Sequence, residues 1–299
     1  MEDYTNRGLK YGLCILLASL AAVIVAVPVL AQQAPSVTLV GAGDIADCGS
    51  RGDEATAKLV KNIPGTVFTL GDNAYDRGTA SEFANCYNPT WGQFKSRTRP
   101  STGNHDYYST GARPYFNYFG ARAGKPSRGY YSYDRGGWHI IALNSNCDKV
   151  GCGLRSAQAR WLRQNLASHP SKCTLAYFHH PLFASGGKTE STAVRPFWRI
   201  LYNRGADVIL SGHAHRYERF VPQNPDGGRD LDRGIREFIV GTGGEAPEGP
   251  INGTDPNSVV KNDKTPGVLK LTLSADSYSW KFVHIPGKTF TDSGNARCH

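Results

Sequence analysis

Apolar residues of this 299-residue chain gather in short runs that are separated by polar, glycine-rich segments. Five of the runs have the length of buried strands, and they cover residues 37–40, 66–70, 138–143, 174–178 and 207–210. Segments with helical periodicity lie between them, near residues 54–60, 156–167 and 193–203. Strands that alternate with helices predict an α/β domain that begins with a βαβ unit.

The closing part of the chain has a different pattern. Three further runs, at 237–240, 267–273 and 277–283, alternate apolar and polar residues or lie beside turns, which is typical of antiparallel strands in a second sheet. We therefore expect one α/β domain of two packed mixed β-sheets flanked by helices. This domain is expected to span residues 36–285, and residues 286–299 are expected to form a C-terminal tail.

The N-terminal segment has the pattern of a secretory signal. Arg7 and Lys10 precede an apolar run over residues 11–30, and residues 29–31 fit the small-residue pattern of a cleavage site. This predicts a signal peptide over residues 1–31 and a secreted, periplasmic or extracellular protein. The alternative is an uncleaved membrane anchor, because the run approaches the roughly 18 residues that span a bilayer.

The composition is that of an ordinary globular protein, with 39% apolar and 20% charged residues, and it does not indicate disorder. The formal net charge of +9 favours anionic partners such as phosphate esters or polyanions. A solvated surface excess of Lys and Arg explains the same charge, because the sequence has no long basic cluster. No specific nucleic-acid partner is indicated, and the oligomeric state stays open.

Cysteine usage also favours export. Cys14 lies in the N-terminal segment, and the six remaining cysteines are Cys48, Cys86, Cys147, Cys152, Cys173 and Cys298. An even number fits an oxidising compartment, but six cysteines permit 15 connectivities. The short Cys147/Cys152 loop is the easiest pair to form, and our hypothesis adds the pairs Cys48/Cys86 and Cys173/Cys298.

Five polar motifs carry the candidate chemistry, and four of them follow an apolar run directly. They are Gly43-Asp44, Gly71–Tyr75, Gly103–Asp106, His179-His180 and Gly212–His215. Ligands delivered at the carboxyl ends of strands meet at one edge of a sheet. Carboxylate, amide and imidazole groups suit divalent first-row metals, and a phenolate adds a preference for a hard trivalent ion such as iron(III).

The spacing of these groups predicts two adjacent metal ions. Asp72 is the natural bridge, because one aspartate can bind two metals about 3.5–4 Å apart. His213 and His215 are two residues apart, so on an extended strand both imidazoles point to the same face. Four histidines lie outside these motifs, and we interpret them as surface or hydrogen-bonded residues: His139, His169, His284 and His299.

The motifs GDIAD, GDNAYD, GNHD, FHHP and GHAHRYER resemble the five metal-binding blocks of the calcineurin-like metallophosphoesterases. Most members carry a histidine two residues after the first aspartate, whereas Ile45-Ala46 follows Asp44 here. This difference, together with Tyr75 three residues after Asp72, resembles the purple acid phosphatases. The resemblance covers approximately residues 36–285 and implies a four-layer sandwich of two sheets and flanking helices.

The resemblance implies a ligand set for each metal. The first metal is expected to be Fe(3+), and its ligands are Asp44, Asp72, Tyr75 and His215. The second is expected to be Zn(2+), Mn(2+) or Fe(2+), and its ligands are Asp72, Asn104, His179 and His213.

The same resemblance assigns roles to residues beside the metals. His105 is expected to protonate the leaving alkoxide, and Asp106 is expected to orient it. Support of the metal ligands is the alternative role for His105. His180 and Lys188 are candidate contacts for the phosphate or the leaving group. The Gly241–Gly244 segment resembles the family's small-residue loop near the site, and a tight turn at a strand end is the alternative.

Together these features predict a secreted acid phosphatase that hydrolyses small phosphorylated substrates by attack of metal-bound hydroxide. A phosphodiesterase or nucleotide phosphohydrolase on the same two-metal core is one alternative. A polyanion-binding protein with a structural metal site is another, and it rests only on the positive charge. Membrane association is expected only if the N-terminal segment stays attached.

Overall fold

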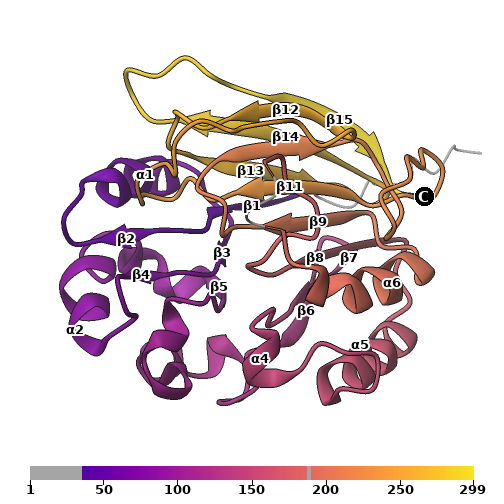
Figure 1. Ribbon diagram of the computed structural model, residues 1–299, viewed down its shortest axis with the longest axis horizontal. Coiled ribbons are helices and arrows are strands. Elements are labelled where there is room, and N and C mark those ends of the chain that lie inside the picture. The colour runs from indigo at the N-terminus through magenta and orange to yellow at the C-terminus, as the bar shows by residue number, and fades with distance from the viewer. Residues whose placement is uncertain (1–35, 187–189) are drawn as a thin grey trace, which may run out of the picture. The chain divides into compact units, whose positions relative to one another are not determined.

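Two mixed β-sheets pack face to face in the computed structural model, which describes residues 36–186 and 190–299 (Figure 1). The first sheet has the strand order β15 (Ser293–Arg297), β14 (Ser277–His284), β13 (Gly267–Leu273), β1 (Val37–Ala42), β3 (Thr66–Leu70) and β5 (Thr98–Ser101). The second has the order β12 (Ser258–Asn262), β10 (Tyr217–Phe220), β11 (Arg236–Val240), β9 (Val208–Ser211), β8 (Cys173–Tyr177), β7 (Trp138–Ala142) and β6 (Tyr131–Arg135). A small third sheet pairs β2 (Ala46–Asp47) with β4 (Ala74–Tyr75).

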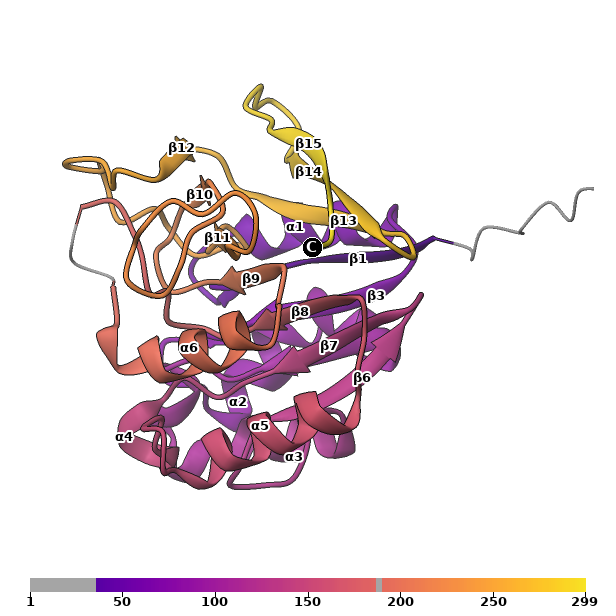
Figure 2. The same cartoon turned by 90° about the vertical axis from the view of Figure 1, so that its right-hand side faces the viewer.

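Helices flank the two sheets, as Figures 1 and 2 show. The α-helices are α1 (Gly52–Lys61), α2 (Ala80–Glu82), α3 (Arg113–Phe119), α4 (Cys147–Val150), α5 (Ala157–Ser168) and α6 (Arg195–Asn203). Shorter 3₁₀ or π segments are η1 (Phe83–Tyr87), η2 (Trp91–Arg97), η3 (Asp106–Tyr108), η4 (Thr110–Ala112), η5 (Gly120–Ala123) and η6 (Thr192–Val194). The expected α/β class, with two packed sheets and flanking helices, is confirmed.

Large apolar side chains fill the space between the sheets. Phe68 of β3 faces Tyr177 of β8 at a ring separation of 6.3 Å, and Tyr217 of β10 packs on Phe282 of β14 at 4.6 Å. Strands such as β8 are buried along their whole length, because the other sheet covers one face and helices cover the other. This explains why the central strands read as continuous apolar runs rather than as alternating ones.

The closing strands correct one expectation, because they do not form a sheet of their own. β11 pairs with β9 in parallel and so belongs to the second sheet. β13 pairs with β1 in antiparallel orientation, and β14 pairs with β13, so both extend the first sheet. Alternation along a strand reports that one face is covered and does not identify the neighbouring strand. The sequence pattern therefore located these strands without their partners.

The C-terminal residues also carry structure. β15 lies within residues 286–299, where a tail was expected, and pairs with β14 in antiparallel orientation. Cys298 follows it and forms a disulfide with Cys173 at the start of β8, so the end of the chain is bonded to the second sheet. The other two disulfides join Cys48 to Cys86 and Cys147 to Cys152. All three hypothesised pairs are present in the structure.

Across residues 36–186 and 190–299, no helix is both long enough and apolar enough to span a bilayer. The expected signal peptide or anchor over residues 1–31 lies outside the described residues.

Candidate metal centre

The five polar motifs meet where parallel strands of both sheets end. Asp44, Asp72 and Asn104 follow β1, β3 and β5 of the first sheet. The histidine motifs follow β8 and β9 of the second. Because these strands run parallel within each sheet, their carboxyl ends share one edge, as expected for an open α/β sheet.

Three of the expected ligands have left-handed backbone conformations, with φ of 59° at Asp44, 47° at Asp72 and 68° at His213. Such conformations are unfavourable for residues other than glycine and gather at functional sites, where packing holds them in place. Gly103 packs against one of them, since an added Cβ would lie 2.0 Å from Oδ1 of Asp72. The sharp turns direct the side chains of the motifs into a common space.

The first group of expected ligands surrounds the hydroxyl of Tyr75. Its oxygen lies 3.0 Å from Oδ1 of Asp44, 3.1 Å from Oδ2 of Asp72 and 3.2 Å from Nε2 of His215. Two ligands that are each ~2.1 Å from a metal and at right angles to each other lie ~3 Å apart. The spacing of these four atoms is therefore that of neighbouring ligands around one ion.

The second group surrounds Nε2 of His179. This atom lies 2.9 Å from Oδ1 of Asn104, 3.1 Å from Oδ2 of Asp72 and 3.2 Å from Nδ1 of His213. Oδ2 of Asp72 is thus within 3.1 Å of both groups. The structure brings together all seven expected ligands, with Asp72 in the position that a bridging ligand needs.

The tautomers of two histidines, one in each ligand group, favour the binding of a cation in each group. Nδ1 of His179 lies 2.7 Å from the carbonyl of Leu70, and Nδ1 of His215 lies 2.7 Å from the carbonyl of Ala246. A carbonyl oxygen only accepts, so both rings must donate from Nδ1. In the neutral rings, Nε2 then carries a lone pair that faces carboxylate oxygens. The donor set therefore fits two metal ions.

In the protein without metals, protons on His179 and His215 supply the positive charge that the metal ions would otherwise provide. Burial opposes the charged form of His179, but the carboxylates of Asp72 and Asp44 outweigh it and raise the pKa of His179 to about 9. Burial is likewise outweighed at His215, where Asp44 raises the pKa to about 9. Metal binding must displace these protons, because only the neutral imidazole is a ligand.

Two other expected ligands, His213 and Tyr75, are instead neutral in the protein without metals. Burial and the nearby charge of His179 lower the pKa of His213 to about 4, so this ring is neutral and ready to bind at physiological pH. Burial and the carboxylates of Asp44 and Asp72 raise the pKa of the Tyr75 phenol well above 10. A tyrosinate at this position would therefore require a strongly charged cation beside it.

The surroundings of His105 correct one expectation. Asp106, expected to orient this ring, instead accepts hydrogen bonds from the amide of Gly103 and the side chain of Asn73, both at 2.9 Å. Burial, followed by the charge of Asp72, raises the pKa of Asp106 to about 7. Asp106 thus holds the Gly103–Asp106 loop. Its short, buried side chain reaches the neighbouring backbone and Asn73 instead of the His105 ring.

Asp76 is the residue that contacts the His105 ring. Nδ1 of His105 lies 2.6 Å from the carbonyl oxygen of Asp76 and 3.2 Å from its Oδ1. The ring packs at a tilt against that of Tyr75, with 4.4 Å between centroids. His105 thus lies beside the first ligand group with Nδ1 engaged by Asp76. Asp76 directly follows Tyr75 in the sequence, and this adjacency was its only signal.

His180 lies beside the second ligand group. Its ring is 4.5 Å from that of His213 between centroids, and its Nδ1 lies 2.9 Å from Oγ of Ser145. Burial, and then the neighbouring His179, lower the pKa of His180 well below 6.5, so this ring is neutral. Ser145 was not anticipated from the sequence. Lys188, the other candidate substrate contact, lies outside the described residues.

The glycine loop Gly241–Gly244 packs directly on the first motif. The amide of Gly243 donates to the carbonyl of Gly43 at 2.9 Å, and an added Cβ on Gly241 would lie 2.0 Å from the carbonyl of Ala214. None of these glycines has a left-handed φ. Close backbone approach, rather than a tight turn, therefore explains the glycines.

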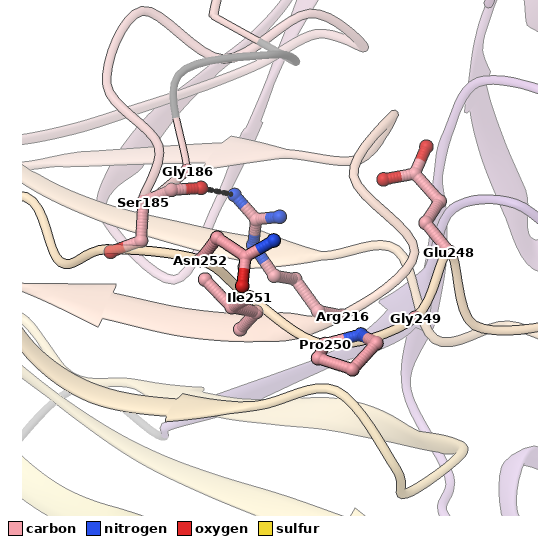
Figure 3. A pocket seen from close by; sticks show the side chains of 8 residues that line it. All are labelled: Ser185, Gly186, Arg216, Glu248, Gly249, Pro250, Ile251 and Asn252. Carbon is pink, nitrogen blue, oxygen red and sulfur yellow. Dashed lines mark hydrogen bonds between the residues drawn. The ribbon is translucent and has the colours of Figure 1, made fainter.

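A cavity of about 230 Å³ is lined by Ser185, Gly186, Arg216 and the loop from Glu248 to Asn252 (Figure 3). Arg216 is buried and donates to Oε2 of Glu218 at 3.1 Å and to the carbonyl of Ser185 at 2.5 Å. This ion pair and the bond to Ser185 hold the segment that directly follows His213 and His215. It was not anticipated, although both residues lie in the GHAHRYER motif.

Comparisons with known proteins agree with this arrangement. A family model described as calcineurin-like phosphoesterase matches residues 18–217. Purple acid phosphatase 15 of Arabidopsis thaliana is 25% identical over 240 residues, which cover 68% of this chain and 44% of that protein. Probable purple acid phosphatase 20 of the same plant is 30% identical over 199 residues, which cover 57% of this chain and 44% of that protein. The chain thus spans less than half the length of these relatives.

Solved structures share the fold. A purple acid phosphatase from yellow lupin (Lupinus luteus) seeds superimposes with a TM-score of 0.70 and 21% identity, covering 89% of this chain and 54% of that one. GAP50, described as the anchor in the inner membrane complex of Plasmodium, superimposes with a TM-score of 0.65 and 15% identity, covering 88% and 89%. At these identities the likeness concerns the fold alone.

Proposed function

This chain belongs to the calcineurin-like phosphoesterase family, and we propose that it is a two-metal phosphomonoesterase of the purple acid phosphatase type. One observation carries the proposal. The Tyr75 oxygen lies within 3.2 Å of Asp44, Asp72 and His215, so a phenol belongs to the first ligand group. A phenolate favours a hard trivalent ion, which is the preference that separates this type from a general two-metal phosphoesterase.

Seven side chains would hold the two ions. Fe(3+) would be held by Asp44, Asp72, Tyr75 and His215, and Zn(2+), Mn(2+) or Fe(2+) by Asp72, Asn104, His179 and His213. When bound, the two cations neutralise phosphate oxygens and lower the pKa of water, which supplies a nucleophile near neutral pH.

The remaining groups of the site orient the ester and move a proton. His105 presents Nε2 for the leaving oxygen, because Asp76 engages Nδ1. The neutral His180 ring lies where it could donate a hydrogen bond to a phosphate oxygen from Nε2, since Ser145 contacts its Nδ1. Proton donation by a positioned side chain accelerates a reaction typically ~10²–10⁴-fold. Each of these roles belongs to a residue whose ring is fixed by a described contact.

We further propose that the catalytic domain is exported. The three disulfides support an oxidising compartment, in which such bonds persist. The signal-like segment at residues 1–31 supports the same destination. The domain would comprise residues 36–285 together with β15 of the C-terminal segment, because β15 completes the first sheet.

The proposal is tested by purifying the protein, determining its metals and recording its visible spectrum and its hydrolysis of p-nitrophenyl phosphate and bis(p-nitrophenyl) phosphate. We expect two metals per chain, a visible tyrosinate-to-iron band and preference for the monoester. Tyr75→Phe should abolish the band, whereas Tyr115→Phe, a buried phenol outside the ligand groups, should retain it. A colourless active enzyme would place the protein among the general phosphoesterases, preference for the diester would favour a phosphodiesterase, and inactivity after metal reconstitution would refute hydrolysis.

A further inference from the structure

The exposed ring of Tyr108 lies next to His105, the proposed proton donor, and extends the site toward the surface. Among the large apolar side chains of the described residues, Tyr108 is one of the few that are exposed, at 51% of its surface. Its ring packs against that of His105 with 4.6 Å between centroids, and His105 packs in turn on Tyr75 at 4.4 Å. Three rings thus run in series from the first ligand group to the surface.

The segment that carries Tyr108 is held firmly. Tyr108 ends the 3₁₀ segment η3, and the hydroxyl of the next residue, Ser109, donates to the carbonyl of Arg77 at 2.9 Å. Gly78 packs so closely beneath η3 that an added Cβ would lie 2.7 Å from Cα of Asp106. The Arg77 guanidinium lies 6.0 Å from the centroid of the Tyr108 ring. These contacts fix the ring while leaving half of it accessible.

From this arrangement we propose that Tyr108 is the leaving-group contact of the site and that it selects phosphate esters of aromatic alcohols over those of aliphatic ones. The inference rests on the proposed function, because His105 marks the position of the leaving oxygen. A planar group bonded directly to that oxygen can reach the neighbouring ring of Tyr108 and pack on it. Aromatic pairs in such contact gain affinity beyond their buried area.

The geometry also distinguishes aryl esters from nucleotides. In a nucleoside 5′-monophosphate, the ribose separates the base from the leaving oxygen, so the base would pass beyond a ring that directly adjoins His105. An alkyl ester has no planar face to offer. The structure therefore favours a ring joined to phosphate through a single oxygen, as in phenyl phosphate or a phosphotyrosine side chain.

The test compares kcat/KM for phenyl phosphate and ethyl phosphate in the metal-loaded enzyme and its variants. Tyr108→Ala should lower the aryl-to-alkyl ratio of kcat/KM by about 3- to 10-fold, the size of an aromatic pair contact, and Tyr108→Trp should retain or raise the ratio. Loss of support for His105 would instead slow ethyl phosphate more than phenyl phosphate and raise the ratio, because ethoxide is the poorer leaving group and depends more on proton donation. Tyr202→Ala on α6, which packs on the second sheet away from the motif loops, is the matched control.

An equilibrium measurement accompanies the kinetics. By calorimetry, phenylphosphonate should bind the wild-type enzyme more tightly than methylphosphonate, and Tyr108→Ala should remove most of that difference. An unchanged aryl-to-alkyl ratio together with unchanged phosphonate selectivity overturns the role of Tyr108 while the proposed function stands. Failure of the wild-type enzyme to hydrolyse either ester would instead remove the proposed function on which the inference rests.

Discussion

A buried carboxyl group that belongs to neither ligand group supports a prediction about the pH dependence of stability. Glu237 of β11 is fully buried, and it accepts a hydrogen bond from the hydroxyl of Ser211 at 3.0 Å. Its Oε2 has no hydrogen-bond partner among the described residues. Burial outweighs the bond from Ser211 and raises the pKa of Glu237 to about 8 from an ordinary value of 4.5.

The sign of the pH dependence follows from this difference. The folded protein holds the Glu237 proton more tightly than the unfolded chain, so the stabilisation is complete below about pH 4.5 and is lost as the pH rises to about 8. Each pH unit in this window is worth ~1.4 kcal/mol, which gives a total of about 5 kcal/mol. In the Glu237→Gln variant an amide replaces the acid and carries no ionisation cost.

Urea unfolding of both proteins at several pH values measures the effect. We expect similar stability at pH 4.5 and a stability difference that grows in favour of Glu237→Gln by several kcal/mol by pH 8.5. Asp53 and Asp106, whose pKa values burial also raises, are present in both proteins and cancel in the difference. Glu248→Gln, at an exposed position, is the control. Parallel stability curves for wild type and Glu237→Gln would refute a neutral buried acid.

Three further predictions concern the site and the fold. His105→Ala should lower kcat by about 10²–10⁴-fold with metal content unchanged, and parallel loss of metal and activity would contradict proton donation. Gly103→Ala should reduce metal content, measured by atomic absorption, because its Cβ would lie 2.0 Å from Oδ1 of Asp72 in the present backbone. Replacing Cys173 and Cys298 together by Ala should lower the free energy of unfolding by about 5 kcal/mol, because their disulfide spans 125 positions. Wild-type stability in urea would show that this crosslink is dispensable.

The fold was predictable where a strand is bounded by turns and covered by the core. The bounds of β3 and β13 agree with the apolar runs at 66–70 and 267–273, because glycine or proline precedes or follows each run. β15 could not be predicted, since its residues SGNAR contain a single apolar side chain and it becomes a strand through pairing with β14. The assignment of closing strands to sheets likewise depends on tertiary pairing, which a local pattern does not record.

The site was predictable in its ligand types and less so in its supporting contacts. The positions of Asp72 and Tyr75 follow from motifs that end strands, and their atoms do meet. The partner of His105 was predicted wrongly, because Asp106 and Asp76 are both plausible from the sequence and only the paths of two loops decide between them. Short-range spacing thus identifies donors, whereas contacts between loops need the folded chain.

The placement of ligands on both sheets has a thermodynamic consequence. Asp44, Asp72 and Asn104 come from the first sheet and the histidine ligands from the second, and His179 also bonds to the carbonyl of Leu70 across the interface. A cation shared between these loops would bind only when both sheets are assembled. Its binding free energy would then add to the cooperativity of folding, as any ligand specific to the native state does. Metal ions bound at this centre would therefore stabilise the packing of the two sheets against each other.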